Sequence, residues 1–403
     1  MFGFTNKQIK THFTQRDILE RGVEEVIEKN HLTHVLYSKK LRVKFGIDPT
    51  GPNLHLGHTV PLWKLRQFQE LGHTAVLIIG DFTATIGDPT GRSEERKTLT
   101  SKEVKKNMDR YIEQAGKILD IKKTEIHYNS EWHNKEGFEK ILQLARTATL
   151  QQIIKRSDFK ERIEKGADIT FIELFYPLFQ GYDSVKVKAD VEIGGTDQKF
   201  NLLMGRQVQR RFGQPEQDII LLPLLTGVDG EKKMSKSFNN YIALLDKPND
   251  IFGKVMSIDD SQISSYFELV TPLPTSAVKK IKNMPISGKN ARDLKIRLAR
   301  TITEIYWGAR AAEEAQAKFE SVFSRGELSP NTTEITIKQK EIDIRDLLIM
   351  ANLISSKSEA ARKITQGGVR IDGIPIKDPY TKIKIKGGEV ISVGKRKSAK
   401  IKI

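Results

Sequence analysis

The sequence predicts an α/β protein with a doubly wound parallel sheet, followed by an α-helical domain and a small α+β C-terminal domain. Three observations predict this order. A strand–helix–strand unit lies near the N-terminus, amphipathic helices with proline-containing breaks follow residue 247, and short alternating strands end the chain. The predicted boundaries are 1–246 for the sheet domain, 247–324 for the helical domain, 325–340 for a linker and 341–403 for the last domain.

The first domain is predicted from two apolar runs and the segment between them. Leu41–Ile47 is typical of a strand, and Thr74–Phe82 of a buried parallel strand. The segment "PLWKLRQFQELG" predicts a helix with Pro61 in its first turn and Gly72 at its end. A third hydrophobic strand is expected at Asp218–Gly227, and the region between the second and third strands is expected to be mostly helical.

The two later domains differ in pattern. The segments "ARDLKIRLARTITEIYWG" and "AAEEAQAKFESVF" are amphipathic, which predicts helices. Residues 324–341 are polar and rich in breakers, which predicts a linker. The last domain is expected to begin with two short helices and to continue with the strands in "VRIDG", "KIKIK" and "EVISVG". It holds 14 Lys and Arg and 7 Asp and Glu, a net charge of +7.

Composition restricts the possible partners and surroundings. The 403 residues carry a formal net charge of +16, which favours a polyanionic partner such as nucleic acid. The absence of cysteine excludes disulfides and thiolate metal sites and is typical of a reducing compartment. No run approaches the roughly 18 apolar residues of a membrane helix. We therefore expect a cytoplasmic protein without a membrane partner.

The stretch "GIDPTGPNLHLGHTV" places His55 and His58 between a strand and a helix. A helix N-terminus at this edge of a sheet presents free N–H groups, and two imidazoles add hydrogen-bond donors for phosphate. The histidines could instead be ordinary caps or metal ligands. The other histidines are scattered, no cysteine is present and no acidic cluster has ligand spacing, so we expect no metal site.

A second motif, "GEKKMSKS", follows the third predicted strand and contains Lys233 and Lys236. Mobile lysines at the carboxyl edge of a sheet can close on a triphosphate as charge develops on its oxygens. The alternative is a solvated basic loop. A third motif, "YPLFQGYD", puts Tyr176, Gln180 and Asp183 on one helix face. A buried aspartate there needs a donor, such as a phenolic hydroxyl, although the helix could simply carry polar residues beside its apolar ones.

Taken together, HLGH and KMSKS resemble the two signatures of class I aminoacyl-tRNA synthetases. With "GDPTGR", "YPLFQGYD" and "GGTDQ", the resemblance narrows to the bacterial tyrosyl-tRNA synthetase family, as a divergent subgroup, and covers essentially the whole chain. It implies a Rossmann-like catalytic domain, a helical domain that binds the anticodon arm and an S-four-like RNA-binding domain. It also implies a homodimer that uses L-tyrosine, ATP with Mg²⁺ and tRNA(Tyr).

The resemblance also implies roles for individual residues. Catalytic roles fall to residues that would contact the phosphates: Thr50, His55, His58, Lys233, Lys236, Arg92 and Arg96. Contacts to ATP or the adenylate fall to Gly46, Asp48, Gly57, Gly195, Asp197 and Lys236. Contacts to tyrosine fall to Asp88, Tyr176, Gln180, Asp183 and Gln198, with Asp183 at the hydroxyl. RNA contacts fall to Lys357, Arg362 and Lys363.

Three positions depart from the family pattern. Lys44 stands where many members have a tyrosine that touches the substrate hydroxyl, Phe45 where a polar ribose contact is common, and Lys199 where a tryptophan is common. Three other functions compete with the predicted one: a tryptophanyl-tRNA synthetase, a nucleotidyltransferase with an HxGH motif, and a noncatalytic RNA-binding protein. Asp183, the KMSKS motif and the retained His55 and His58 argue against them in turn.

Overall fold

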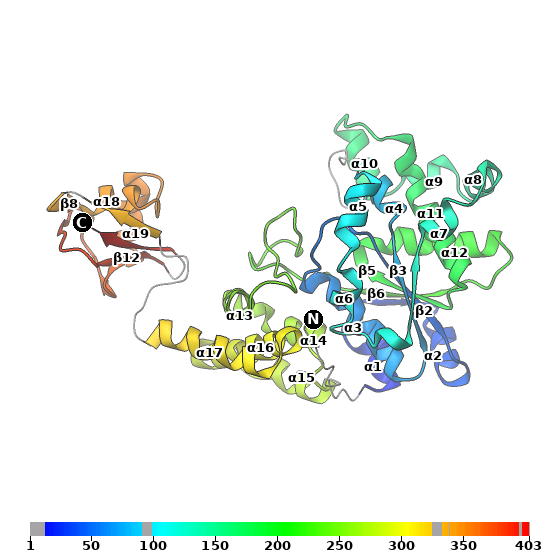
Figure 1. The fold of residues 1–403 in the computed structure, drawn as a ribbon, viewed down its shortest axis with the longest axis horizontal. Helices are drawn as coiled ribbons and strands as arrows, with labels where there is room; N and C mark the ends of the chain where they lie inside the picture. The colour runs from blue at the N-terminus through cyan, green and yellow to red at the C-terminus, as the bar shows by residue number, and fades with distance from the viewer. Residues whose placement is uncertain (1–12, 91–98, 325–332, 338, 395–396, 403) are drawn as a thin grey trace. The chain divides into compact units, whose positions relative to one another are not determined.

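A computed structural model describes residues 13–90, 99–324, 333–337, 339–394 and 397–402 of the chain (Figure 1). The chain divides into two compact units, Met1–Glu313 and Glu314–Ile403. The first unit contains the large sheet and most of the helices, and the second contains a smaller sheet.

The large sheet confirms the predicted α/β architecture. Its strand order is β1-β6-β5-β2-β3-β4, and every neighbouring pair is parallel except β1 with β6. The chain passes from β2 to β3 on one side and later reaches β5 on the other, which makes the sheet doubly wound. The strands are β1 (Glu25–Ile27), β2 (Arg42–Ile47), β3 (Thr74–Ile79), β4 (Thr124–Tyr128), β5 (Val191–Gly195) and β6 (Asp218–Leu222).

The predicted helix between β2 and β3 is present, but it begins earlier than expected. Helix α3 spans Leu56–Glu70, so Pro61 lies inside it and not in its first turn. His55 is the N-cap residue, and its backbone N–H donates to Nδ1 of His58 at 3.1 Å. This bond satisfies one of the free N–H groups at the helix start, so the histidines that were expected before the helix form its beginning.

The side chains of β3 alternate between the two faces of the sheet, which divides the core into two layers. Val76 and Ile78 pack in one cluster with residues of α11 (Tyr176–Val187) and α12 (Lys199–Arg211). Their neighbours Leu77 and Ile79 are equally buried and point to the opposite face, since side chains alternate along a strand. Helix α3 packs against β2, β3 and β5. The sheet is therefore covered by helices on both faces (Figure 1).

The sequence missed three of the six strands. The segment before Asp218 was expected to be mostly helical, yet it contains β4 and the central strand β5, and β1 lies at the edge. These strands are short, and β5 carries the charged residue Glu192 at a buried position. The helices around them are α1 (Gln15–Glu20), α2 (Lys29–Ser38), α4 (Thr83–Ile86), α5 (Ser101–Met108), α6 (Tyr111–Ala115), α7 (Ser130–His133), α8 (Phe138–Ala145), α9 (Leu150–Ile154) and α10 (Ser157–Glu164), with the 3₁₀ helices η1 (Ile121–Lys123), η2 (Phe171–Phe175) and η3 (Thr196–Gln198).

In the region after residue 247, helix α14 packs against α3 of the sheet domain. Buried Arg21, just after α1, donates to the backbone carbonyls of Glu268 and Thr271 at the end of α14. Lys64 of α3 donates in turn to three carbonyls at the end of α1. Both cations satisfy carbonyls that a helix end leaves free. The later helices are α13 (Pro248–Met256), α14 (Ile263–Val270), α15 (Thr275–Lys282), α16 (Gly288–Trp307) and α17 (Ala309–Ser324), with η4 (Asp260–Gln262).

The second unit is an α+β domain, as predicted, but it begins before residue 341. The range 325–340, expected to be a linker, contains β7 (Thr333–Thr336), which pairs in parallel with β13 (Lys397–Lys402). The five-stranded sheet has the order β10-β9-β12-β13-β7, and β8 pairs with β11. The other elements are β8 (Glu341–Asp343), α18 (Ile344–Met350), α19 (Lys357–Thr365), β9 (Val369–Ile371), β10 (Ile374–Pro375), β11 (Lys382–Lys384) and β12 (Val390–Val393).

Candidate active site

A cavity of about 320 Å³ opens at the carboxyl ends of β2, β5 and β6. The winding of the sheet changes direction between β2 and β5, and ligands of doubly wound sheets bind at such a point. The cavity brings together eight of the predicted site residues: Thr50, His55, Gly57, His58, Gly195, Asp197, Lys233 and Lys236. They come from three segments that are far apart in the sequence.

The two histidines of HLGH lie against each other in this cavity. Their ring centroids are 3.7 Å apart, and Nδ1 of His55 is buried without a hydrogen-bond partner among the described residues. Burial, together with the charge of Lys236, lowers the pKa of His55 to about 3. Burial also lowers the pKa of His58 well below its ordinary value. Both imidazoles are therefore neutral at pH 7, so each can donate one hydrogen bond to a ligand.

The KMSKS loop is held in place from both sides. Nζ of Lys233 forms an ion pair with Asp197 at 2.7 Å, and Nζ of Lys236 donates to the carbonyl of Gly51 at 3.3 Å. Asn240 accepts from the N–H of Ser235 and donates to the carbonyl of Lys233. Sequence reasoning missed Asn240, because an asparagine beyond the motif carries no signal of its own.

Asp48 belongs to a neighbouring cluster and does not line the cavity. Its carboxylate accepts from the hydroxyl of Tyr176 at 3.0 Å and from that of Thr83 at 2.8 Å. A side chain at Gly80 would meet the carboxylate of Asp48 at 2.0 Å, so this position requires glycine. Burial and the nearby carboxylates raise the pKa of Tyr176 well above its ordinary value, and its hydroxyl keeps its proton. Gly46, on β2, also lies outside the lining of the cavity.

The second cluster is built on α11, which presents Tyr176, Gln180 and Asp183. Asp183 is almost fully buried, and it accepts from Nε1 of Trp132 at 2.9 Å, from Nε2 of His133 at 2.9 Å and from Nδ2 of Asn129 at 3.2 Å. These three donors follow β4. The sequence analysis missed β4, and it therefore missed the residues that β4 delivers to the site.

Lys44 also lies beneath this cluster and not at its surface. Its Nζ is fully buried and contacts Glu192 at 2.8 Å, Ser184 Oγ at 2.7 Å and the carbonyl of Gln180 at 2.9 Å. Gln180 in turn donates from Nε2 to Glu192 at 3.2 Å. Lys44 therefore supports the turn of α11 that carries Gln180, and its ammonium is already fully engaged.

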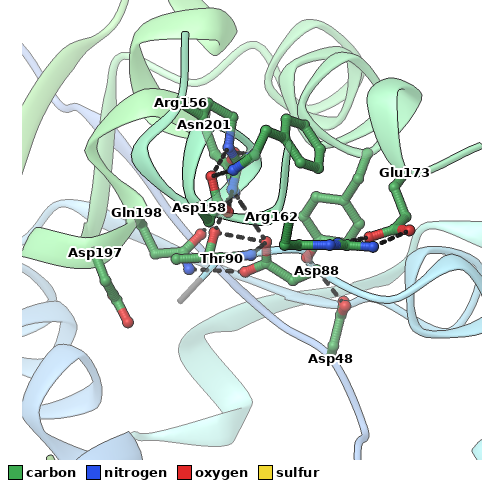
Figure 2. A network of polar contacts seen from close by, with 12 residues as sticks. Asp48, Asp88, Thr90, Arg156, Asp158, Arg162, Glu173, Asp197, Gln198 and Asn201 are labelled. Carbon is green, nitrogen blue, oxygen red and sulfur yellow. Dashed lines mark hydrogen bonds and ion pairs between the residues drawn. The ribbon is translucent and has the colours of Figure 1, made fainter. Parts of the chain in front are cut away.

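Asp88 and Gln198 meet in a third group of contacts (Figure 2). Nε2 of Gln198 donates to Asp88 at 2.8 Å, and Oε1 of Gln198 accepts from Asn201 at 2.9 Å. Buried Arg156 donates to Asn201 and to Thr90, each at 2.9 Å. Arg156 thus joins the "GDPTGR" loop to the start of α12. Neither Arg156 nor Asn201 stands in a motif that sequence reasoning recognised.

Arg92 and Arg96 fall outside the described residues. Phe45 lines the cavity, and Lys199 forms an ion pair with Glu25 at 2.6 Å. The predicted RNA-contacting residues Lys357, Arg362 and Lys363 all lie on α19 of the second unit.

No group of three or more His, Cys, Asp or Glu side chains could hold a metal ion within the described ranges. No helix in those ranges is long and apolar enough to span a membrane.

The chain is similar to known proteins over almost its whole length. Residues 37–324 match the family "tRNA synthetases class I (W and Y)", and residues 346–391 match the S4 domain. The tyrosine–tRNA ligase of Dehalococcoides mccartyi is 48% identical over 386 residues, which cover 95% of this chain and 97% of that protein. The tyrosine–tRNA ligase of Moorella thermoacetica is 46% identical over 393 residues, 96% and 95% of the two chains.

Solved structures share the fold. A C-terminally truncated mitochondrial tyrosyl-tRNA synthetase from Aspergillus nidulans is 23% identical, with a TM-score of 0.65 over 76% of this chain and 93% of that one. The Archaeoglobus fulgidus tyrosyl-tRNA synthetase complexed with L-tyrosine is 22% identical, with a TM-score of 0.61 over 74% and 98%. From the family match and the full-length relatives, we conclude that the chain belongs to the tyrosine–tRNA ligase family of class I aminoacyl-tRNA synthetases.

Proposed function

We propose that this chain activates L-tyrosine with ATP in the cavity at the sheet edge and then transfers the tyrosyl group to the 3′ end of tRNA(Tyr). One observation carries this proposal: HLGH and KMSKS, about 180 residues apart, line one cavity beside a buried aspartate cluster on α11. The cavity suits a nucleoside triphosphate, and the cluster around Asp183 suits an amino acid whose side chain carries a hydroxyl.

At the nucleotide end, neutral His55 and His58 donate hydrogen bonds to the phosphates beside Thr50. Lys233 leaves Asp197 when ATP enters and moves to the phosphates with Lys236, since a triphosphate attracts an ammonium more strongly than one carboxylate does. Asp197 is then free to accept from the ribose hydroxyls. Residues with backbone or supporting roles near the nucleotide are Gly46, Asp48, Gly57 and Gly195, and Arg92 and Arg96 are proposed to join the phosphates.

At the amino-acid end, Asp183 accepts from the tyrosine hydroxyl. Tyr176, Gln180, Gln198 and Asp88 surround the ammonium group. The carboxylate of Asp88 supplies the negative charge that an ammonium requires. The tyrosine carboxylate then points toward the cavity, where the α-phosphate of ATP lies.

The chemistry is a direct displacement. A tyrosine carboxylate oxygen forms a bond to the α-phosphorus, and the bond from that phosphorus to the bridging oxygen of pyrophosphate breaks. Lys233 and Lys236 stabilise the charge that develops on the leaving pyrophosphate, and the other residues of the site hold tyrosine and ATP in position for the reaction. No side chain acts as a covalent nucleophile. Mg²⁺ enters with ATP and is held largely by its phosphate oxygens.

The tRNA is bound by surfaces outside the cavity. The second unit matches the S4 domain, and Lys357, Arg362 and Lys363 on α19 are proposed to contact RNA backbone. The helices from α13 to α17 are proposed to contact the anticodon arm. Because ATP and tRNA are cytoplasmic substrates, we also propose that the chain acts in the cytoplasm.

We further propose that the chain works as a homodimer. Large apolar side chains are exposed on consecutive segments from α8 to η2, with Phe138 71% exposed and Phe171 75% exposed. Exposed apolar surface of this kind is typical of protein interfaces. The other members are Leu142, Leu150, Ile163 and Ile172.

The test is ATP–pyrophosphate exchange by the purified protein with each standard amino acid in turn, followed by aminoacylation of tRNA. We expect exchange with tyrosine alone and charging of tRNA(Tyr). Exchange with tryptophan would assign the cavity to the other branch of the family. RNA binding without exchange for any amino acid would overturn the proposed activity.

A further inference from the structure

The carboxylate of Asp183 is nearly saturated with hydrogen bonds before any substrate binds. Oδ1 accepts from both Trp132 Nε1 and His133 Nε2, each at 2.9 Å, and Oδ2 accepts from Asn129 Nδ2 at 3.2 Å. A carboxylate has about four lone-pair positions. Three of them are occupied by described residues, so a single acceptor position remains, on Oδ2.

The orientation of Asn129 is fixed by its other contacts. Its Oδ1 accepts from the backbone N–H of Phe82 at 2.9 Å, so its Nδ2 must face Asp183. That Nδ2 also donates to the hydroxyl of Thr83 at 3.0 Å. Asn129 can therefore act toward Asp183 only as a donor.

His133 is fixed by its ring. The imidazole stacks on Phe82 with centroids 4.8 Å apart and planes at 26°, and it meets the edge of Phe179 at 5.1 Å. Its side chain is only 3% exposed. Because the carboxylate of Asp183 supplies lone pairs, Nε2 of His133 carries the hydrogen of this contact. The ring cannot turn away without losing its aromatic packing.

We propose that His133 is a specificity-determining positioning residue for tyrosine. By completing, with Trp132, the occupation of Oδ1 of Asp183, His133 leaves Oδ2 as the one acceptor for the substrate and fixes its direction. The site then selects a side chain with one neutral donor at the para position of its ring, and rejects a ring with none or with an acceptor only. This inference rests on the proposed function, since it assumes that Asp183 binds the amino-acid side chain.

A purely structural role predicts something different. If the three donors only stabilise a buried charge, losing one lowers the stability of the fold but leaves the choice of amino acid unchanged. A charge-assisted hydrogen bond contributes about 1.5–3 kcal/mol, so its loss at the binding step corresponds to roughly a ten- to hundredfold effect. The two roles are separated by KM and by selectivity.

The experiment measures ATP–pyrophosphate exchange with tyrosine, 4-aminophenylalanine, 4-fluorophenylalanine and phenylalanine. The wild-type chain should use tyrosine and 4-aminophenylalanine, whose para groups donate hydrogen bonds, and should reject 4-fluorophenylalanine and phenylalanine. His133→Phe keeps an aromatic ring beside Phe82 but removes the N–H. We expect its KM for tyrosine to rise about tenfold or more, with a smaller change in kcat, and its preference for tyrosine over phenylalanine to fall by a similar factor. His133→Gln, which retains an N–H donor, should recover part of both losses.

His73→Phe is the matched control. His73 is also buried, lies edge-on to Phe68 and accepts the N–H of Leu41 at 3.2 Å, but it is outside the site. This variant should alter the melting temperature and leave both KM and selectivity unchanged. The inference is overturned if His133→Phe behaves in the same way, or if the wild type uses 4-fluorophenylalanine as well as tyrosine. If His133→Phe does not fold, the same measurements on His133→Gln decide the question, since a purely structural role leaves the KM and selectivity of that variant at the wild-type values. A wild type that shows no exchange with tyrosine would overturn the proposed function itself.

Discussion

The two ends of the candidate active site are built in opposite ways. At the nucleotide end, backbone turns and two lysines on a loop line an open cavity, and each lysine side chain makes a polar contact that a ligand can replace. At the amino-acid end, helix α11 holds Asp183 in a buried set of three donors. The difference fits the proposed function, in which charge develops on the leaving pyrophosphate at one end while the other end must recognise a single side chain.

The largest effect is expected at the amino-acid end, which is the rigid end because three donors hold Asp183; the nucleotide end, with its cavity, is the open end. Asp183→Asn keeps the size of the side chain but replaces an acceptor by an N–H donor, which faces the donors Trp132, His133 and Asn129. Leaving such groups without an acceptor costs about 3–5 kcal/mol, so kcat/KM for tyrosine should fall about 10³-fold. Exchange kinetics provide the measurement. A loss of less than tenfold would show that Asp183 does not bind the substrate.

The ion pair between Lys44 and Glu192, beneath α11, should affect the stability of the fold more than it affects the rate of the chemical step. Lys44→Met leaves Glu192 buried without its cation, which is expected to cost about 3–5 kcal/mol in the free energy of unfolding. Adding Glu192→Gln removes the stranded charge and should restore a large part of that loss. Urea unfolding of both variants tests this. Equal stability of the single and double variants would contradict the ion pair as the source of the effect.

At the open end, the expected effect is on rate. Lys233→Ala removes one of the proposed donors to the leaving pyrophosphate, so kcat should fall about 10²-fold while KM for tyrosine stays within about twofold. Lys199→Ala is the matched control, since Lys199 also forms an ion pair with a carboxylate but lies outside the cavity. Pre-steady-state formation of tyrosyl adenylate measures both. A rise in KM for tyrosine without a fall in kcat would move Lys233 to the binding step.

The smallest effect concerns the histidines of the open end and depends on pH. The pKa of His55 is about 3 in the folded chain, against an ordinary 6.5, so between these values only the unfolded chain binds the proton. Stability therefore falls as pH drops from 7 to 5, by about 1–2 kcal/mol for this residue.

Unfolding in urea at pH 7 and pH 5 measures this loss. His55→Asn should reduce the difference between the two pH values by about that amount. His34→Asn, at an exposed position of α2, should leave the difference unchanged. An unchanged difference in His55→Asn would show that His55 is not buried in its neutral form.

The two ends also differ in how far the sequence could predict them. At the open end, two short contiguous motifs form the site. A turn with two histidines and a loop with two lysines each follow an apolar strand, and the strand order brings them together. Thr50, His55, His58, Lys233 and Lys236 were all predicted, and all line the cavity. Local pattern was sufficient there, because each motif lies in the segment that follows the carboxyl end of a predicted strand.

At the rigid end, the sequence identified Tyr176, Gln180 and Asp183 through their helical spacing but not the residues that hold them. His133, Asn129 and Trp132 depend on β4, and Lys44 depends on its pairing with Glu192 of β5. Both strands were missed because charged or polar residues interrupt their apolar pattern, Glu125 and His127 in β4 and Glu192 in β5.

By itself, the sequence determined the α/β class, the helical and α+β regions that follow, the family resemblance and the motif residues. Only the tertiary structure decided which lone pair of Asp183 is left for a substrate, that Lys44 is buried beneath α11, and that residues 333–336 belong to the C-terminal sheet. The reason is physical. Periodicity and motifs record interactions between residues close in the chain, whereas buried polar contacts are chosen by partners that folding brings together from distant segments.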